Sequence, residues 1–126
     1  MLDEGVKRLT KGRNFATLAF LMSDGSPANH MMWVDSDDKH ILLNTETGRF
    51  KYGCIQRDQR VSVAVRNEDD PYDYVEVRGV VEDTITGDEA RTHIDSLSEK
   101  YTGGPYKNPI ETERVILKIR PTRQIS

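Results

Sequence analysis

Cysteine is nearly absent from this chain of 126 residues, and the one present, Cys54, has no partner for an internal disulfide. A reducing compartment would also disfavour a bridge between two chains. We therefore interpret Cys54 as a small buried residue. The three histidines, His30, His40 and His93, show none of the spacings of zinc ligands. The sequence thus indicates no metal site, and we interpret the histidines as ordinary surface or sheet residues.

The chain also lacks a strong charge of one sign and a long apolar run. Its formal net charge is -3, and its charged residues, 31% of the total, mix both signs, so no surface basic enough for a nucleic-acid backbone is expected. The longest apolar stretch, residues 15–22, is interrupted by Thr17 and is too short to cross a bilayer. The first residues do not resemble a signal peptide. We expect a cytoplasmic protein with no nucleic-acid partner and no membrane contact.

Several catalytic sequence motifs are missing as well. The chain has no Gly-x-Ser-x-Gly elbow, no Walker loop and no G-x-G-x-x-G fingerprint. Acyl transfer, P-loop phosphoryl transfer and dinucleotide binding on a Rossmann fold therefore lose their usual sequence signals.

The sequence does contain a series of short runs that predict β-strands. Asp24-Gly25 lies between two extended runs and is a strong signal for a hairpin turn. Residues 60–66 place valine at alternate positions, as in a strand with one buried face. Gly79 lies inside a longer run and predicts a bulge or bend of the kind that curves a sheet into a barrel. The predicted strands cover residues 14–22, 27–34, 40–45, 60–66, 72–82 and 114–119.

Short helices are predicted around these strands. A leading helix is expected within residues 1–13, and a crossover helix within residues 47–57, because both segments carry apolar residues at helical spacing. A third helix is predicted over residues 86–101, where Thr86 and Glu89 form a capping-box pattern ahead of a regular apolar stripe.

These elements predict one domain over residues 1–126. With six strands at short spacing and few helices, the expected fold is mainly β, an antiparallel barrel with peripheral helices. The loop at residues 102–109 contains two prolines, and we interpret it as a shaped lid that borders a substrate pocket.

The most informative segment is residues 44–51, which joins a strand end to a helix start. A helix N-terminus presents unpaired backbone N–H groups and a partial positive charge, which favour anions. This segment adds threonine hydroxyls, Gly48, Arg49 and Lys51. The guanidinium of Arg49 is suited to grip a phosphate with two hydrogen bonds, and Lys51 adds a point charge. An N-cap at Thr47 followed by a solvated basic face explains the same pattern about equally well.

Two aromatic segments are further candidates. Residues 31–34 include Trp33, the only tryptophan, and form an apolar surface that could cover an aromatic ring, although core packing is the commoner use of such residues. Tyr72 and Tyr74 flank an acidic residue at a junction between a loop and a strand. The start of an amphipathic strand would account for this second pattern as well.

Taken together, these segments resemble the split β-barrel family typified by pyridoxamine 5'-phosphate oxidase. The resemblance extends over about residues 15–119 and is nearest to the branch of small flavin and deazaflavin oxidoreductases that use coenzyme F420, which includes biliverdin reductases. The motifs that carry it are Ala16-Thr17-Leu18-Ala19, Asp24-Gly25-Ser26-Pro27, Met32-Trp33-Val34-Asp35, Asn44-Thr45-x-x-Gly48-Arg49-x-Lys51, Arg57-Asp58-x-Arg60-Val61, Tyr72-x-Tyr74-x-Glu76-Val77-Arg78-Gly79 and Lys100-Tyr101-x-Gly103.

The resemblance implies a homodimer with two cofactor clefts at its interface. Gly48, Arg49 and Lys51 would hold the cofactor phosphate, and the tyrosines would reach the cleft from the other subunit. The further residues that the resemblance implies at the cofactor are Asn44, Thr45 and Thr47 as hydrogen-bonding groups, Met32, Trp33 and Val34 along the tricyclic ring, Tyr72 and Tyr74 from the other subunit, and Arg78.

Three positions depart from the family pattern. Met31 stands where a proline is common, and Gln59 replaces another common proline. Gly53-Cys54 replaces a frequent Arg-Asn pair, which removes one cationic contact to a phosphate. The basic pair Arg49 and Lys51 remains.

The reaction implied by the resemblance is hydride transfer from reduced F420 to a conjugated small-molecule substrate, with the protein supplying position, electrostatics and exclusion of water. No catalytic residue is indicated, because Arg78, Tyr74 or solvent could each deliver the proton. Two alternatives remain open. One is an FMN-dependent oxidase or reductase on the same fold, and the other is a non-enzymatic carrier of a flavin, a tetrapyrrole or a lipid-like ligand.

Overall fold

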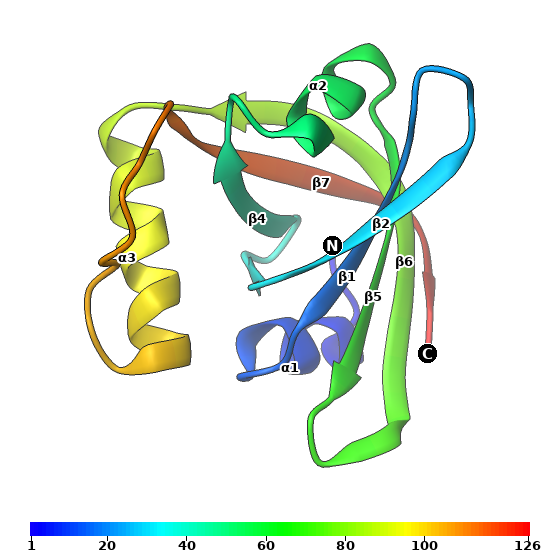
Figure 1. Ribbon diagram of the computed structural model, residues 1–126. Coiled ribbons are helices and arrows are strands. Elements are labelled where there is room, and N and C mark those ends of the chain that lie inside the picture. The colour runs from blue at the N-terminus through cyan, green and yellow to red at the C-terminus, as the bar shows by residue number, and fades with distance from the viewer.

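Seven β-strands form one antiparallel sheet that curls around the core, and three helices lie at its margins (Figure 1). The computed structural model describes residues 1–126, the whole chain. The strands are β1 (Ala16–Leu21), β2 (Pro27–Met32), β3 (Asp35–Ser36), β4 (Ile41–Glu46), β5 (Arg60–Asn67), β6 (Asp70–Ile85) and β7 (Arg114–Ile125). The helices are α1 (Glu4–Lys11), α2 (Phe50–Arg57) and α3 (Asp88–Thr102).

The strand order is β2-β1-β5-β6-β7-β4-β3, so the sheet is curled but open, with β2 and β3 at its free edges. The prediction of a mainly β, antiparallel split barrel is confirmed. The predicted count of six strands is one too low, because β3 was not foreseen. This strand consists only of Asp35 and Ser36, which pair with Leu42 and Ile41, and two residues are too few to show an alternating pattern.

The predicted hairpin at Asp24-Gly25 joins β1 to β2. Gly25 has a φ of 85°, a conformation that glycine adopts without steric penalty. The carboxylate of Asp24 accepts a hydrogen bond of 2.9 Å from the backbone N–H of Ser26. The turn sets the register of this strand pair. Leu21 lies opposite Pro27 and Ala16 lies opposite Met32, so β2 ends beside the start of β1.

The long strand β6 bends at Gly79, as the sequence predicts. The pairing of β6 with β7 shifts register between Arg78 and Gly79. A Cβ atom at position 79 would lie 2.3 Å from the carbonyl oxygen of Arg120, so the close approach of the two backbones excludes a side chain here. The first part of β6, to residue 80, pairs with β5, and the part from residue 76 onward pairs with β7, so the bend lies where the two pairings overlap and curls the sheet.

The core fills the inside of the curled sheet. The alternating valines of β5 are buried, and in the sheet Val63 lies opposite Leu18 of β1 and Val77 of β6. Helix α1 packs against β3, β5 and β6 and buries Val6 and Leu9 in the same cluster. Each such side chain contributes about 1.5–3 kcal/mol relative to an exposed position.

Helix α3 lies against β7 and β4, on the side of the sheet away from the β1–β2 hairpin (Figure 1). The predicted capping box at its start is wrong. The helix begins at Asp88, its N-cap is Gly87 with a φ of 78°, and no side chain caps it. Thr86 therefore lies one residue too early to reach the first turn. The helix ends at Gly103 in a left-handed conformation, and its buried face forms a second, smaller cluster.

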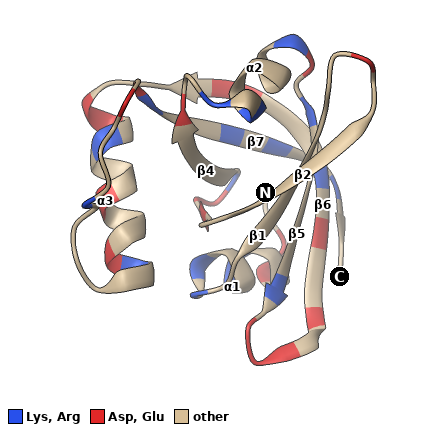
Figure 2. Cartoon of the chain, in the orientation of Figure 1, with Lys and Arg blue, Asp and Glu red and all other residues tan.

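Acidic and basic residues are interspersed over most of the chain (Figure 2). Three acidic residues follow one another where β5 turns into β6: Glu68 and Asp69 form the turn, and Asp70 begins β6. None of the three helices is both long enough and apolar enough to pass through a membrane.

Candidate functional site

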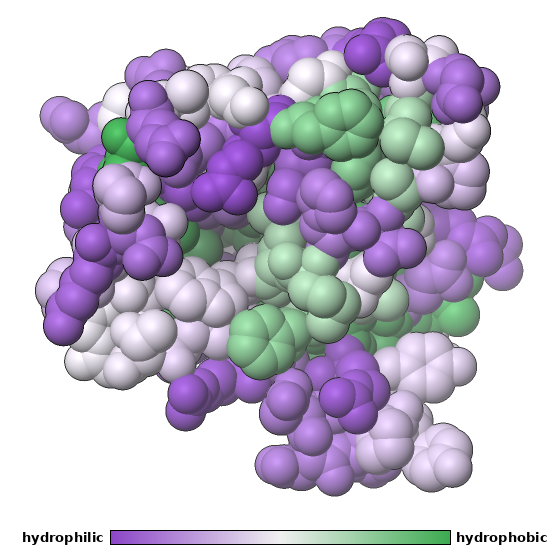
Figure 3. Space-filling view, viewed as in Figure 1, coloured by the Kyte–Doolittle hydropathy of each residue, from purple (hydrophilic) through white to green (hydrophobic).

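A cavity of about 320 Å³ opens between the ends of β2 and β4, the first turn of α2, and α3. Figure 3 shows apolar residues gathered at the centre of this side of the molecule, beside a hollow. The predicted site residues that line the cavity are Met32, Trp33, Asn44, Thr45, Arg49 and Lys51. Segments far apart in the sequence thus meet at one place.

Three cations gather at this cavity against one carboxylate. Nη1 of Arg114 lies 3.4 Å and Nη2 of Arg49 lies 3.7 Å from Oε2 of Glu46, whereas Lys51 forms no ion pair. Two positive charges are therefore left without a counterpart. Such a concentration of cations in one concave site attracts an anion.

Lys51 is the least compensated of these cations. Its side chain comes from the first turn of α2 and is buried, with 9% of the residue exposed. Burial lowers the pKa of its ammonium group, and repulsion from Arg49 and Arg114 lowers it further. A partly desolvated ammonium without a counterion is unfavourable, so an anion in the cavity would relieve the repulsion and supply the missing partner.

Glu46 holds the cationic cluster together. Its Oε1 accepts hydrogen bonds from the backbone N–H groups of Glu111 and Thr112, at 3.1 and 2.9 Å, and from the hydroxyl of Thr112 at 3.0 Å. The bond from the Thr112 backbone is the main cause of a lowered pKa of Glu46, and it outweighs the opposite effect of burial together with the other donors. The carboxylate is ionised and fixes the segment before β7 against the end of β4.

Asn44 orients Arg114 from the other side. Its Oδ1 accepts a hydrogen bond of 2.8 Å from Nε of Arg114. Its Nδ2 lies 3.0 Å from both the carbonyl oxygen of Ala90 and Nδ1 of His93. Both amide hydrogens of Asn44 are thus engaged within the protein, which makes this residue a support for the guanidinium.

Aromatic rings form another wall of the cavity. The rings of Trp33 and Tyr101 are stacked, with centroids 5.2 Å apart and planes inclined by 4°. Tyr106 meets Trp33 edge to face at 6.3 Å, and the guanidinium of Arg114 lies 5.2 Å from the Tyr106 ring centroid. Tyr106 and Asn108 belong to the loop at residues 102–109, so this loop does line the cavity.

Three predicted residues next to the cavity make contacts outside it. The side chain of Val34 is fully buried in the core. The hydroxyl of Thr47 accepts a hydrogen bond of 3.4 Å from the backbone N–H of Glu113, and the backbone N–H of Gly48 donates to the hydroxyl of Thr112 at 3.1 Å. Both hydrogen bonds hold the segment before α2 against the segment before β7. The N-cap of α2 is Arg49 and not Thr47, because the helix begins only at Phe50.

The remaining predicted residues lie on other surfaces of the same chain. Tyr72 is 90% exposed, and Tyr74 lines a separate groove of about 340 Å³ with Phe15 and Met31. Arg78 lines a third concavity of about 510 Å³. Its Nε donates a hydrogen bond of 2.9 Å to Glu76.

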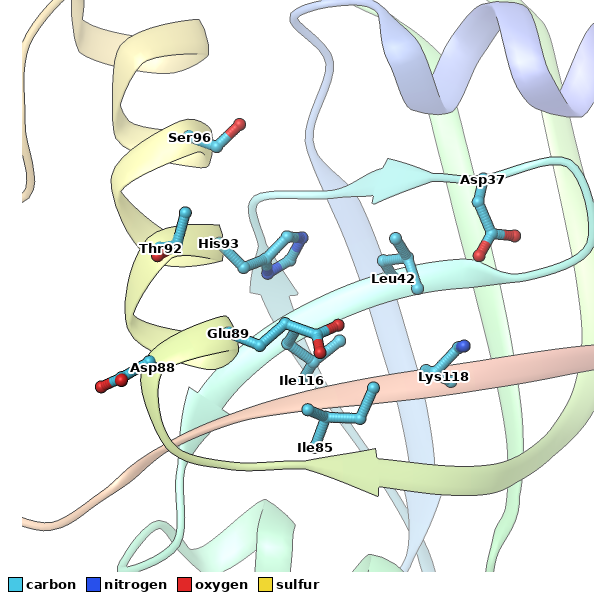
Figure 4. Close-up of a pocket in the computed structure, with 10 residues that line it drawn as sticks. All are labelled: Asp37, Leu42, Ile85, Asp88, Glu89, Thr92, His93, Ser96, Ile116 and Lys118. Atoms are coloured by element: carbon cyan, nitrogen blue, oxygen red, sulfur yellow. The ribbon is translucent and has the colours of Figure 1, made fainter.

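A further cavity of about 500 Å³ lies between α3 and the strands β4 and β7 (Figure 4). None of the predicted site residues lines it. Figure 4 shows His93 extending from α3 toward Leu42 at the wall of this cavity. His93 therefore lies between the two cavities, since its Nδ1 reaches Asn44 of the first one. The interpretation of His93 as an ordinary surface or sheet residue is wrong.

Four residues that complete the cluster were not predicted from the sequence, namely Glu46, Arg114, Tyr106 and His93. Arg114 opens the last strand, and only the pairing of β4 with β7 places it opposite Glu46. No local sequence pattern predicts a contact between residues so far apart in the chain. A charged residue at the start of an otherwise apolar run, as in Arg114 before residues 115–117, was the one available signal.

The fold and the site define a split β-barrel protein with a cationic, aromatic-walled cavity at the side of the sheet. The sequence profile described as pyridoxamine 5'-phosphate oxidase matches residues 2–125. The chain belongs to this family, which confirms the resemblance read from its motifs. None of the curated proteins compared matches the sequence.

Solved structures agree with this assignment. One described as an F420 reductase is 33% identical, with a TM-score of 0.85, and 98% of each chain is covered. A conserved hypothetical protein from Mycobacterium tuberculosis is 28% identical, with a TM-score of 0.77, covering 98% of this chain and 82% of that chain. General stress protein 26 from Bacillus anthracis is 18% identical with a TM-score of 0.68, covering 96% of this chain and 89% of that chain, and shows the shared fold.

Proposed function

We propose that this protein is an oxidoreductase that binds coenzyme F420 at the interface of a homodimer and reduces a conjugated small-molecule substrate. The family membership and the F420 reductase neighbour support an oxidoreductase with a flavin or deazaflavin cofactor. The observation that carries the proposal is Lys51, a largely buried side chain whose ammonium has no ion-pair partner and lies beside Arg49 and Arg114.

The residues of the cavity fit the two parts of such a cofactor. The uncompensated cations suit a phosphate, and the guanidinium of Arg49 can form two parallel hydrogen bonds to it. The first turn of α2 adds N–H groups that have no acceptor within the helix. Met32 and Trp33 offer an apolar and aromatic wall of the kind that covers a flat ring.

The open rim of the cavity supports a second copy as its cover. At about 320 Å³ the cavity is at the small end for a site that encloses an organic ligand. Phe15 and Met31 on its rim are 41% and 66% exposed, and they continue into the groove that holds Tyr74. In a dimer these apolar side chains would be buried, and the tyrosines of β6 would come from the partner.

When bound, the deazaflavin supplies the hydride-transfer chemistry. The chain's own contribution is to hold the phosphate through Lys51, Arg49 and Arg114, to keep Trp33 fixed against Tyr101, and to exclude water. Arg78 and Tyr74 lie outside the cavity of their own chain, so in this proposal a proton reaches the substrate from solvent or from the partner subunit.

A fluorescence titration of Trp33, the only tryptophan, tests this proposal. Wild type and Arg49→Ala/Lys51→Ala are titrated with F420 and, separately, with FMN. The proposal expects strong quenching by F420 that the double variant loses. The matched control, Arg13→Ala/Lys39→Ala, removes the same charges from exposed positions outside the cavity and should bind F420 as the wild type does.

Other results of the titration would redirect the assignment. Quenching by FMN alone would favour the FMN-dependent alternative, since that cofactor also combines a phosphate with a tricyclic ring. Binding of F420 without any oxidation of the reduced form by conjugated acceptors would favour a carrier. An unchanged signal with both ligands would contradict the cofactor site.

A further inference from the structure

The amide orientation of Asn44 is fixed by two neighbours on opposite sides. Nδ2 donates to the carbonyl oxygen of Ala90 at 3.0 Å, and Oδ1 accepts from Nε of Arg114 at 2.8 Å. If the amide were reversed, an oxygen would face the carbonyl and an N–H would face the guanidinium N–H. Both contacts would then be repulsive, so only the observed orientation satisfies the network.

This orientation determines the protonation state of His93. Its Nδ1 lies 3.0 Å from Nδ2 of Asn44, which is a donor, so Nδ1 must act as the acceptor and carry no proton. The ring is then neutral, with its single proton on Nε2. That Nε2 atom is buried and has no hydrogen-bond partner in the protein.

The surroundings of the ring favour the neutral form. Burial lowers the pKa of His93, and repulsion from Lys100 and Arg114 acts in the same direction, while Asp35 and Glu89 oppose it. The other charged groups along the adjoining cavity are Asp37, Asp88 and Lys118.

We propose that neutral His93 is a positioning residue for the anion site, because it holds the Asn44 amide that in turn holds the Arg114 guanidinium. This inference rests on the proposed function in one respect, namely that Arg114 contacts the bound anion. When Nδ1 gains a proton, it presents an N–H to the N–H of Asn44, the pair separates, and Arg114 loses one of the two side chains that accept its hydrogen bonds.

The sign of the resulting pH dependence is distinctive. A histidine that touched the anion would bind it more tightly once protonated, since a positive charge is added. Protonation of His93 has the opposite effect and weakens anion binding, because a well-placed cation is released. His30 differs in this respect, since its ring lies near enough to Lys51 for the two charges to interact, and its protonation would add positive charge there.

The first test needs no ligand. The side-chain Nε–Hε resonance of Arg114 is recorded by NMR in wild type, His93→Leu and His93→Asn. Leucine removes the acceptor, whereas the asparagine oxygen can take the place of Nδ1. The proposal expects the resonance to move in His93→Leu and to stay close to its wild-type position in His93→Asn. An unmoved resonance in His93→Leu would overturn it, whatever ligand the cavity binds.

The second test measures sulfate affinity between about pH 8 and pH 5.5, where sulfate keeps its charge and histidine titrates. All proteins carry His30→Asn, so that His93 is the histidine left near the site. The reference protein should lose affinity as the pH falls. His93→Leu should bind about tenfold more weakly at the upper pH, the equivalent of one hydrogen bond to a charged group.

The rescue variant and a control complete the design. His93→Asn should bind with near-reference affinity and no pH dependence from this position. His40→Asn, which alters a histidine paired with Glu82 away from the cavity, should leave the profile unchanged. Affinity that rises on acidification and is insensitive to His93→Leu would overturn the proposal. If sulfate and F420 both fail to bind, the proposed function fails, and the Arg114 resonance still decides the role of His93.

Discussion

The indole ring of Trp33 lies flat against the ring of Tyr101, with planes inclined by 4°, and this stack ties the end of β2 to the end of α3. The hydroxyl of Tyr101 strengthens the connection, because it donates to the carbonyl oxygen of Asn14 and accepts from the backbone N–H of Val34 at 3.1 Å. Burial raises the pKa of this hydroxyl to about 12, so it stays protonated at neutral pH. The wall of the candidate site is therefore part of the structural framework.

Removal of this one hydroxyl tests that conclusion. Tyr101→Phe keeps the stacked ring but leaves a buried carbonyl and a buried N–H without their partner, so we expect the free energy of unfolding to fall by about 1–3 kcal/mol. Urea titration measures the change. Tyr72→Phe, at a position that is 90% exposed, is the matched control and should have almost no effect. Equal stabilities for the two variants would contradict the assigned role of Tyr101.

The bend at Gly79 gives a prediction about backbone packing. In Gly79→Ala, the new methyl group would lie 2.3 Å from the carbonyl oxygen of Arg120, so the two strands must separate. We expect a loss of about 3 kcal/mol in the free energy of unfolding. Gly53→Ala is the control. No atom lies within 4 Å of that Cβ position inside α2, and alanine favours the helix by about 1 kcal/mol, so stability should rise. A harmless Gly79→Ala would show that β6 and β7 are not held at this spacing.

An ion pair between α1 and β6 should make stability depend on pH in the acid range. Both Nη atoms of Arg8 donate to the carboxylate of Asp73, and these bonds, with one from Asn67, lower the pKa of Asp73 to about 2. The folded state thus holds its carboxylate ionised at a pH where the unfolded chain has already bound a proton. The stabilisation is present above about pH 4 and is lost as the pH falls through about 2.

Substitution of Asp73 isolates this contribution. The difference in free energy of unfolding between wild type and Asp73→Asn should be largest near neutral pH and should shrink between about pH 4 and pH 2. Asp69→Asn removes the same charge from an exposed turn residue that forms no ion pair, and it serves as the comparison. A wild-type advantage that persists unchanged into acid would show that the ion pair is not its source.

Much of the fold can be predicted from local sequence signals. Asp24-Gly25 determines a turn by its own backbone preferences, and the alternating valines of residues 61–65 determine which face of β5 is buried. Gly79 marks the bend because no side chain fits there. The start of α3 was placed wrongly since Gly87, with a positive φ, takes the cap position that the Thr86 pattern suggested.

Only part of the candidate site can be predicted from the sequence. Arg49 and Lys51 are near neighbours in one segment, so their shared chemistry can be read directly. Glu46, Arg114 and His93 come together through the pairing of β4 with β7 and the docking of α3, which are contacts across 46 to 70 residues of sequence. A local pattern carries no information about such distances, and the support of the cationic cluster therefore emerges only from the structure.

The buried position of Lys51 implies a trade-off between stability and function. An ammonium that is held next to two guanidinium groups, without a partner of its own, weakens the folded state whenever the cavity contains no anion. Replacement by a neutral side chain of similar length would make the empty protein more robust and at the same time remove the reason for an anion to bind. Stability without a ligand and affinity for an anion thus make opposite demands on position 51.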